Sequence, residues 1–253
     1  MPWLWPLLGA LAGLVAGSFL ATVAVRWPAG RPLTGRSACD GCGSPLGVAQ
    51  LVPILSFLWL RGRCRRCGAA IDRRHPAFEA AAALIGAMAF AAVPGPVGLA
   101  GALFGWGLLL LLALDLEHYW LPDAVVLPLL ALGLLAGPAP LADRALAAAL
   151  LGGGLLLLRL GFAAVRGREG LGLGDVKLGA AIGAWLSPLL IGPFLLLSAL
   201  AGLWLAWAVR RRTRRAEVPF GAAMAVAAFP LWLWLAGARR LEAVTGACVW
   251  ACG

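Results

Sequence analysis

The sequence predicts an all-α polytopic membrane protein of about eight transmembrane helices, with a small cytoplasmic four-cysteine zinc-binding domain between the first two. Hydrophobic residues make up 62% of the 253 residues and charged residues 13%, whereas soluble domains are nearer to half apolar and a quarter charged. Apolar stretches recur at close to the 20 residues that a bilayer core requires. Because lipid cannot satisfy backbone amides, we expect these stretches to be helices.

The spans are expected at roughly eight places along the chain: 3–25, 78–93, 98–114, 124–141, 143–158, 176–190, 191–209 and 218–237. The first has no basic n-region and is long enough to cross a bilayer, so we interpret it as a retained helix and not as a cleaved signal peptide. Frequent Gly and Ala favour close packing between helices. Segments containing Pro and Gly, at 94–97, 137–142 and 187–193, are expected to be tight external turns.

The net charge of +10 is interpreted as a topology signal, and no nucleic-acid partner is expected. With the N-terminus outside, all but three of the 21 basic residues fall on one face of the membrane; the exceptions are Arg144, Arg239 and Arg240. The positive-inside rule makes that face cytoplasmic. The basic residues also favour contact with anionic membrane lipid.

This pattern divides the chain into four parts. Residues 1–25 are the first transmembrane helix, and residues 26–77 form the cytoplasmic cysteine domain. Residues 78–237 make a transmembrane core, and residues 238–253 a short external tail.

Four of the six cysteines form two Cys-x-x-Cys pairs, Cys39/Cys42 and Cys64/Cys67. Two such pairs at this spacing are typical of a tetrahedral zinc site. Disulfides or inert thiols are the alternative, but disulfides are rare in the reducing cytoplasm. A zinc ribbon that contacts nucleic acid is a further, weaker alternative. Cys248 and Cys252 either pair or remain free.

Only 11 acidic residues are present, so their positions are informative. Asp115 follows an apolar run, and an ionisable group at the end of a span is a functional candidate; an interfacial Asp that ends the helix is the alternative. Asp123 follows Pro122 at a position typical of an N-cap. His118 is expected to be structural. Four further acids lie in basic loops as expected ion-pair partners: Asp40, Asp72, Glu169 and Glu217.

Asp175 stands at a helix start after Gly172 and Gly174. It is a possible N-cap, and neither a preceding strand nor a Gly-Lys-Ser/Thr sequence supports a nucleotide site. Asp115 ends another helix on the same predicted face. Two carboxylates that share one proton can act as acid and base towards water.

Taken together, these residues resemble the type IV prepilin peptidases, membrane aspartyl proteases with a Gly-x-Gly-Asp motif. That motif is Gly172-Leu-Gly-Asp175, followed by Val176-Lys177, and the other aspartate block is Asp115-Leu-Glu-His-Tyr-Trp-Leu-Pro-Asp123. The remaining matches include the cysteine pairs and the stretches Gly17-Ser-Phe-Leu20, Pro53-Ile-Leu-Ser56, His75-Pro-Ala-Phe-Glu79 and Pro219-Phe-Gly221. The matches cover most of the chain in the expected order. Departures occur at Ala21, where the family often has Asn, and at Asp40-Gly41 and Ala222, where Pro is common.

The resemblance implies an aspartyl endopeptidase that cleaves the basic leader of type IV prepilins and pseudopilins at the cytoplasmic face of the bacterial inner membrane. Many members then methylate the new N-terminus with S-adenosylmethionine. By matching position, Asp115 and Asp175 are the catalytic pair. The candidate supporting or substrate-binding residues are Glu79, Glu117, Asp123, Gly172, Gly174 and Lys177. Of these, Glu117 or Glu79 is expected to receive the basic leader.

A different class of protein remains open, namely a zinc-ribbon membrane scaffold or a transporter with buried carboxylates. A transporter favours ionisable residues near mid-bilayer and an internal repeat, and the sequence displays neither.

Overall fold

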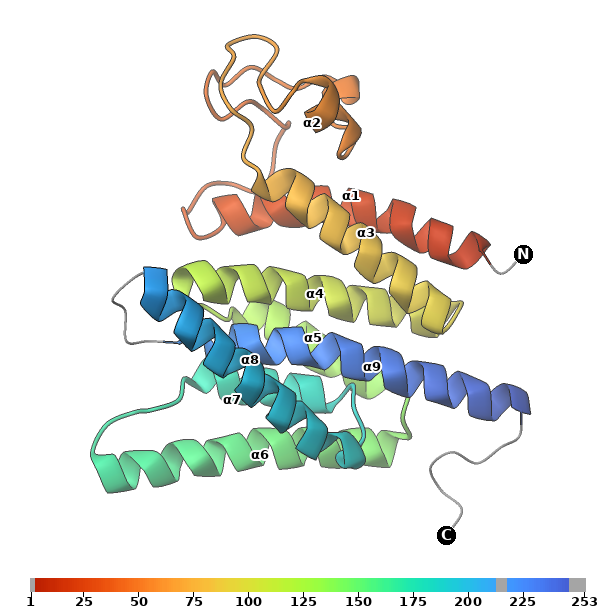
Figure 1. Cartoon of the computed structure of the whole chain (residues 1–253), viewed down its shortest axis with the longest axis vertical. Coiled ribbons are helices and arrows are strands. Elements are labelled where there is room, and N and C mark those ends of the chain that lie inside the picture. Colours follow the sequence, from red (N-terminus) through yellow and green to blue (C-terminus); the bar gives the residue numbers. More distant parts are fainter. Residues whose placement is uncertain (1–2, 213–217, 246–253) are drawn as a thin grey trace. The chain divides into compact units, whose positions relative to one another are not determined.

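Helices account for nearly all of the regular structure in residues 3–212 and 218–245, the part of the chain that the computed structural model describes (Figure 1). The α-helices are α1 (Leu4–Arg26), α2 (Leu55–Trp59), α3 (Arg74–Ala92), α4 (Pro96–His118), α5 (Asp123–Ala136), α6 (Leu141–Arg166), α7 (Leu173–Gly183), α8 (Ile191–Arg212) and α9 (Phe220–Thr245). Two short 3-10 turns, η1 (Val48–Gln50) and η2 (Pro188–Leu190), complete the set. Only isolated β-bridges interrupt this pattern in the described residues. The predicted all-α class is confirmed.

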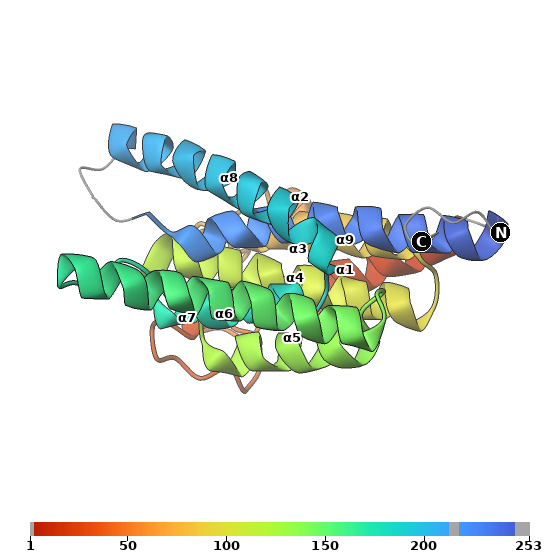
Figure 2. The ribbon, with the colours of Figure 1, turned by 90° about the horizontal axis from the view of Figure 1, so that it is seen from below.

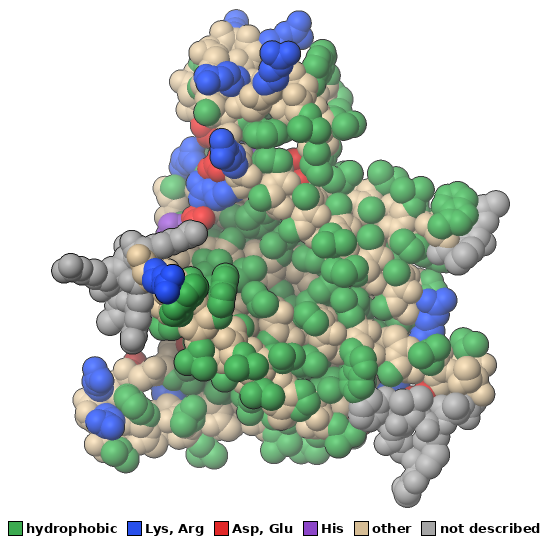
Figure 3. All heavy atoms as spheres, viewed as in Figure 1, with side chains coloured by type: hydrophobic (Ala, Val, Ile, Leu, Met, Phe, Trp, Pro, Cys, Tyr) green, Lys and Arg blue, Asp and Glu red, His purple; other side chains and the backbone are tan. Residues whose placement is uncertain are grey.

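Six of the described helical segments are long and apolar enough to cross a membrane: α1, α3, α4, α6, η2 with α8, and α9. Many large hydrophobic side chains lie exposed along these segments, and apolar atoms cover much of the helical face in Figure 3. A surface of this kind suits lipid and not water. The multi-pass membrane class is therefore confirmed.

Two of the eight predicted spans are shorter than expected. The segment 124–141 forms only the 14 residues of α5, which ends before Gly137. The segment 176–190 forms the 11 residues of α7, after which the chain leaves the helix and enters η2 at Pro188. The apolar composition continues past the end of α7 because Trp185 and Leu186, in the turn that follows, are fully buried. Hydropathy alone does not distinguish a buried turn from a continuing span.

The chain divides into two compact units, Met1–Met88 and Ala89–Gly253. In the first unit α1 packs closely on α3. A Cβ added at Gly13 would lie 2.2 Å from the carbonyl oxygen of Ala82, and one added at Gly17 would lie 2.5 Å from that of Phe78. Glycine is therefore required where these two backbones approach. This is the small-residue packing expected between membrane helices.

The second unit is a bundle in which α6 packs on α7, α8 on α9, α4 on both α5 and α9, and α5 on α7. Its core contains the rings of Phe104 and Trp185, stacked with centroids 4.5 Å apart. The Trp185 indole donates a hydrogen bond to the carbonyl of Leu129 on α5 over 2.9 Å. Helix α8 crosses α9 and diverges from the rest of the bundle toward Arg212 (Figure 2). The short helix α7 is thus enclosed by longer helices of its own unit.

Candidate functional site

Asp115 lies in the last turn of α4, and its side chain is buried with 5% of the residue exposed. The helix continues to His118 and ends at Tyr119, which adopts the left-handed conformation with φ 53°. One carboxylate oxygen of Asp115 accepts a hydrogen bond from the backbone N–H of Ala222 over 2.6 Å. Asp115 therefore points into the bundle, and its carboxylate is not an exposed interfacial group.

Asp175 is the third residue of α7, after the N-cap residue Gly172. Its carboxylate accepts the N–H of Gly172 over 3.2 Å, so Asp175 is not the N-cap residue that its position also suggested, although it binds the backbone of that residue. The N–H of Gly221 donates to the same carboxylate. Burial raises the pKa of Asp175 to about 6, and the charge of nearby Asp115 contributes to the increase, against the two amide hydrogen bonds.

The start of α9 holds the two carboxylates together. Gly221 and Ala222 are consecutive residues in the first turn of α9; the first donates to Asp175 and the second to Asp115. First-turn amides have no partner inside their own helix, and the helix N-terminus carries a partial positive charge that favours anions. The contact brings together two acids that are sixty residues apart in the chain, and its donors are backbone amides, which the positions of acidic side chains do not reveal. The only signal for it in the sequence is the Pro219-Phe-Gly221 stretch.

Glycines surround the two carboxylates, and two of them leave room for the side chain of Leu121. A Cβ at Gly174 would lie 3.1 Å from Leu121 Cβ, and one at Gly221 would lie 2.7 Å from Leu121 Cδ1 and 3.0 Å from an oxygen of Asp115. At Gly172 it would lie 3.1 Å from an oxygen of Asp175. The glycines at these positions therefore allow the two carboxylates to approach the backbone.

Asp123 does not cap α5, so that prediction is wrong. The N-cap position is occupied by Pro122 without a side-chain hydrogen bond, and Asp123 is the first helical residue. Its two oxygens instead accept hydrogen bonds from Lys177 Nζ over 2.9 and 2.7 Å, in an exposed ion pair. Lys177 follows Asp175 by two residues, so this pair ties the start of α5 to the N-terminal part of α7.

The other acidic residues occupy different surroundings. Glu117 is exposed and lies 3.7 Å from His118 Nε2. Three of the four loop acids form ion pairs as predicted: Asp40 with Arg31, Asp72 with Arg74 and Glu169 with Arg159. Glu217, Cys248 and Cys252 lie outside the described residues. Glu79 belongs to the first unit, where it is buried and accepts the backbone N–H of Ile54 over 2.7 Å.

The four cysteines of the first unit converge on one point, with all four Sγ atoms within 4.8 Å of one another. Each Cys-x-x-Cys pair ends in a turn of the same kind. The backbone N–H of Gly43 donates to the carbonyl of Cys39, and that of Gly68 donates to the carbonyl of Cys64. Gly43 and Gly68 have φ 67° and 73°, a conformation that glycine adopts without strain. A zinc ion bound by four thiolates at about 2.3 Å places the sulfur atoms nearly 4 Å apart, and the Sγ atoms of Cys39 and Cys67 are separated by 3.8 Å. The cluster therefore fits a tetrahedral metal ion.

The chain is similar to known families along most of its length. Residues 11–93 match the family model of the bacterial peptidase A24 N-terminal domain, and residues 102–207 that of the type IV leader peptidase family. A prepilin leader peptidase/N-methyltransferase of Aeromonas hydrophila is 36% identical over 269 residues, covering 92% of each chain. The protein of the same name in Pseudomonas aeruginosa is 40% identical and covers 78% of this chain and 71% of its own. That of Dickeya chrysanthemi is 36% identical and covers 89% and 91%. The comparison with solved structures found no significant match.

Proposed function

The chain belongs to the type IV leader peptidase family, and we propose that it cleaves the leader peptide of prepilins through a catalytic pair formed by Asp115 and Asp175. Family membership confirms the predicted class of enzyme and disfavours a scaffold or a transporter. The observation that supports this pair is the arrangement at the start of α9, where consecutive amides hold both carboxylates. The second-unit bundle contains both residues, and the peptidase family model covers both.

In the proposed reaction the two carboxylates share one proton, because two carboxylates this close cannot both remain ionised without cost. The ionised member takes a proton from a water molecule, whose oxygen then attacks the carbonyl carbon of the scissile peptide bond. The protonated member donates its proton to the carbonyl oxygen. When the tetrahedral intermediate collapses, the C–N bond breaks and the leaving amine takes a proton from the first carboxyl, while the second carboxylate takes a proton from one hydroxyl of the intermediate, which restores the shared proton of the pair.

Asp175 is the better candidate for the protonated member, because burial and the neighbouring charge raise its pKa to about 6. Asp115 is then the ionised member, and the 2.6 Å hydrogen bond from the N–H of Ala222 at the start of α9 offsets the unfavourable dipole at the end of α4. We place this pair at the cytoplasmic face of the membrane, since the basic residues are concentrated on the connections next to it. The substrate is then a protein with its own membrane helix and a basic leader on the cytoplasmic side, which Glu117 is placed to contact.

The supporting residues have separate proposed roles. Gly172 leaves room for the Asp175 carboxylate and Gly174 for Leu121, and the Asp123–Lys177 ion pair fixes the N-terminal part of α7 against α5. We assign zinc to the four cysteines, where it stabilises a segment with little apolar core of its own. We also propose that the chain methylates the new N-terminus, as the names of its relatives state for them. S-adenosylmethionine, when bound, supplies the electrophilic methyl group.

Incubation of the purified chain with a prepilin tests the proposal most directly. The precursor should lose its leader without ATP or an ion gradient, and mass measurement of the new N-terminus should reveal an added methyl group when S-adenosylmethionine is present. A precursor of unchanged mass would contradict the peptidase function. Cleavage without added mass would contradict only the methylation.

A further inference from the structure

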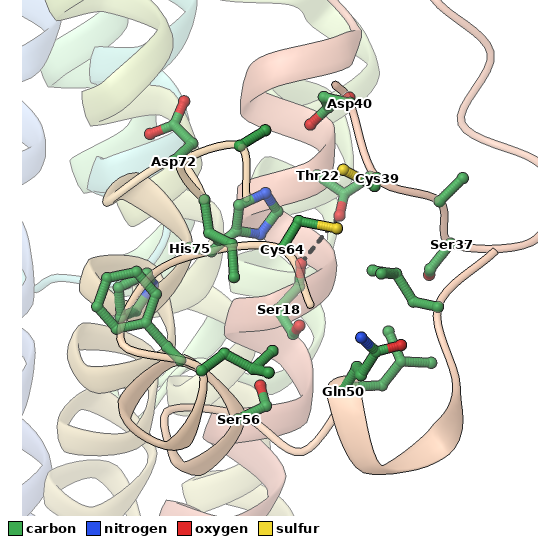
Figure 4. Close-up of a pocket in the computed structure, with 18 of the residues that line it drawn as sticks. Ser18, Thr22, Ser37, Cys39, Asp40, Gln50, Ser56, Cys64, Asp72 and His75 are labelled. Carbon is green, nitrogen blue, oxygen red and sulfur yellow. Dashed lines mark hydrogen bonds between the residues drawn. The ribbon is translucent and has the colours of Figure 1, made fainter. Parts of the chain in front are cut away.

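Among the described residues, polar side chains outside the carboxylate pair gather at several places. One is a cavity of the first unit, where Ser18 and Thr22 of α1 face His75 (Figure 4). The acids Asp40 and Asp72 in its lining are paired with arginines of the same unit. Another is the segment between α6 and α7, and hydrogen bonds connect this segment directly to Asp175. This second place therefore bears on the proposed reaction.

Arg159 is a charged residue inside the candidate span α6, seven residues before that helix ends at Arg166. Its neighbours Leu158 and Leu160 are 62% and 55% exposed, as residues that face lipid would be, whereas the side chain of Arg159 is only 11% exposed. The guanidinium thus points toward the protein. Charged groups within a span are costly, and where they occur they pair with other side chains or with backbone carbonyls. The partners of Arg159 are therefore informative.

The segment before α7 supplies both partners. Nη1 of Arg159 donates to the backbone carbonyl of Leu171, and Nη2 donates to the carboxylate of Glu169. Glu169 is 72% exposed, so solvent screens its ion pair, whereas the bond to Leu171 is partly buried. The segment also packs on α6 at a second point, where a Cβ added at Gly170 would lie 2.5 Å from Cδ1 of Phe162. One face of α6 therefore holds the segment in place.

A single peptide group joins this contact to the carboxylate pair. The carbonyl of Leu171 and the N–H of Gly172 belong to the same peptide bond, and that N–H donates to Asp175 Oδ2 over 3.2 Å. A trans peptide group is planar, so its carbonyl and its N–H point in opposite directions and turn together. Holding the carbonyl on Arg159 therefore aims the N–H at Asp175. A cation on the carbonyl oxygen also polarises the group, because hydrogen bonds in a chain strengthen one another.

We propose that Arg159 is a positioning residue of the peptidase, which acts on Asp175 through the Leu171–Gly172 peptide group. It fixes the direction of the Gly172 N–H and makes that N–H a stronger donor to the carboxylate. The inference rests on the proposed catalytic pair, and it gives Arg159 no contact with the substrate. The hydrogen bond from Gly172 lowers the pKa of Asp175, since it favours the charged form. Loss of Arg159 should therefore raise this pKa further above about 6.

The other charged groups near Asp175 are accounted for on each neighbouring helix. Asp115 of α4 raises the pKa of Asp175 through its charge. Asp123 of α5 is paired with Lys177 of α7 itself, and the start of α9 contributes backbone amides. Arg159 is the cation of α6 that reaches the segment before Asp175. A substitution at Arg159 therefore removes one identified cation from these surroundings.

Prepilin cleavage by the full chain in detergent, measured across a range of pH, tests the proposal. Arg159→Gln should cleave about tenfold or more slowly, because the donor to Asp175 is no longer held in place. The alkaline limb of its kcat/KM profile should lie about 0.5 pH unit or more above that of wild type. Arg159→Lys keeps a cation for the Leu171 carbonyl, so its limb should lie between the two.

Arg166→Gln is the matched control, because it makes the same change on the same helix at an exposed position. Its rate and its alkaline limb should match those of wild type. Thermal unfolding reports whether each variant has folded. If Arg159→Gln has not, Arg159→Met, whose side chain is compatible with lipid, makes the same comparison.

Infrared titration of isotope-labelled aspartate gives the pKa of Asp175 without any cleavage, and Asp175→Asn assigns the band. A higher pKa in Arg159→Gln supports the contact even if the wild-type chain cleaves no prepilin, a result by which the proposed function alone would fail. An unchanged pKa, or slower cleavage with the alkaline limb of wild type, would overturn the inference and leave Arg159 a structural role. If Glu169→Gln moved the limb as far as Arg159→Gln, the ion pair and not the peptide group would carry the effect, and the inference would be wrong.

Discussion

Asp115 and Asp175 are the two members of the proposed acid–base pair, and they occupy opposite ends of their respective helices. Asp115 lies at the C-terminal end of α4, where the helix dipole disfavours a negative charge, whereas Asp175 lies in the first turn of α7, where the dipole favours one. The start of α9 compensates by donating to both. The resemblance places proline at position 222 in many family members, and Ala222 here supplies an N–H that proline lacks.

Asp115→Asn and Asp175→Asn should each lower cleavage by about 10²-fold or more, because asparagine keeps the size of the side chain but cannot share a proton. Rates of precursor shortening, followed by mass measurement, are the test. Asp123→Asn is the control: its exposed ion pair with Lys177 is worth at most about 1 kcal/mol, so most activity should survive. Cleavage at the wild-type rate by Asp175→Asn would remove Asp175 from the proposed pair.

The raised pKa of Asp175 predicts a pH-dependent rate. As the pH rises through about 6, the pair loses its shared proton, so kcat/KM should fall on the alkaline side with an apparent pKa near that value. A profile that stays flat from about pH 5 to pH 8 would exclude a titrating pair.

The carboxyl group of Asp175 should also make the free energy of unfolding depend on pH. Because its folded-state pKa is above the ordinary value of 3.8, Asp175 favours folding most below that value, and this contribution is lost as the pH rises through about 6. The wild-type chain should therefore unfold more easily as the pH rises across this window, and Asp175→Asn should depend less on pH there.

At the scale of elements, the first turn of α9 is the part on which the site depends most. Gly221→Ala places a Cβ 2.7 Å from Leu121 and 3.0 Å from Asp115, so α9 must move away from the carboxylates. A displacement of about 1 Å near a catalytic group costs roughly 10²-fold in rate, and a loss of that order is expected. Adding Leu121→Ala should restore part of it.

Gly237→Ala is the matched control for this substitution, because it adds the same methyl group to the same helix at a position with open space around it. It should cleave like wild type and be slightly more stable, since alanine favours a helix over glycine. Equal losses in the two variants would mean that α9 acts through its stability and not through its first turn.

The two cysteine turns are the second element for which a prediction can be made, and the measurable quantity is the metal content of the chain. Elemental analysis should find about one zinc per chain, and Cys39→Ser combined with Cys64→Ser should remove it. A chain with Cys248→Ser and Cys252→Ser should keep its zinc, because the four clustered thiols complete the coordination. Unchanged metal content in the first double variant would refute the site.

At the scale of the whole molecule, the charge asymmetry predicts which connections are cytoplasmic. Reporter fusions at positions 45 and 214 should report cytoplasmic locations, and fusions at positions 95 and 140 external ones. The opposite result would place the cysteine cluster in an oxidising compartment and the carboxylate pair on the other side of the membrane.

Composition predicted the helical membrane class because lipid leaves the backbone few alternatives, and cysteine spacing predicted the convergence of the four thiols because its geometry is local. The Asp123 cap was predicted wrongly because the actual partner, Lys177, is 54 residues away. The length of α7 was overestimated because the buried turn at Trp185 is apolar, as a span would be. The donors of Gly221 and Ala222 are backbone groups, which the identity of a residue does not reveal.

The contact between α9 and the carboxylates also determines when the proposed site first exists during synthesis. The ribosome adds both aspartates well before residue 220, yet a nascent chain that stops earlier carries neither of the donors that α9 contributes. Chains are made from the N-terminus and their parts fold as they emerge. The proposed site is thus completed only after α9 has left the ribosome, so a translation product that stops before residue 220 contains both acids but no completed site.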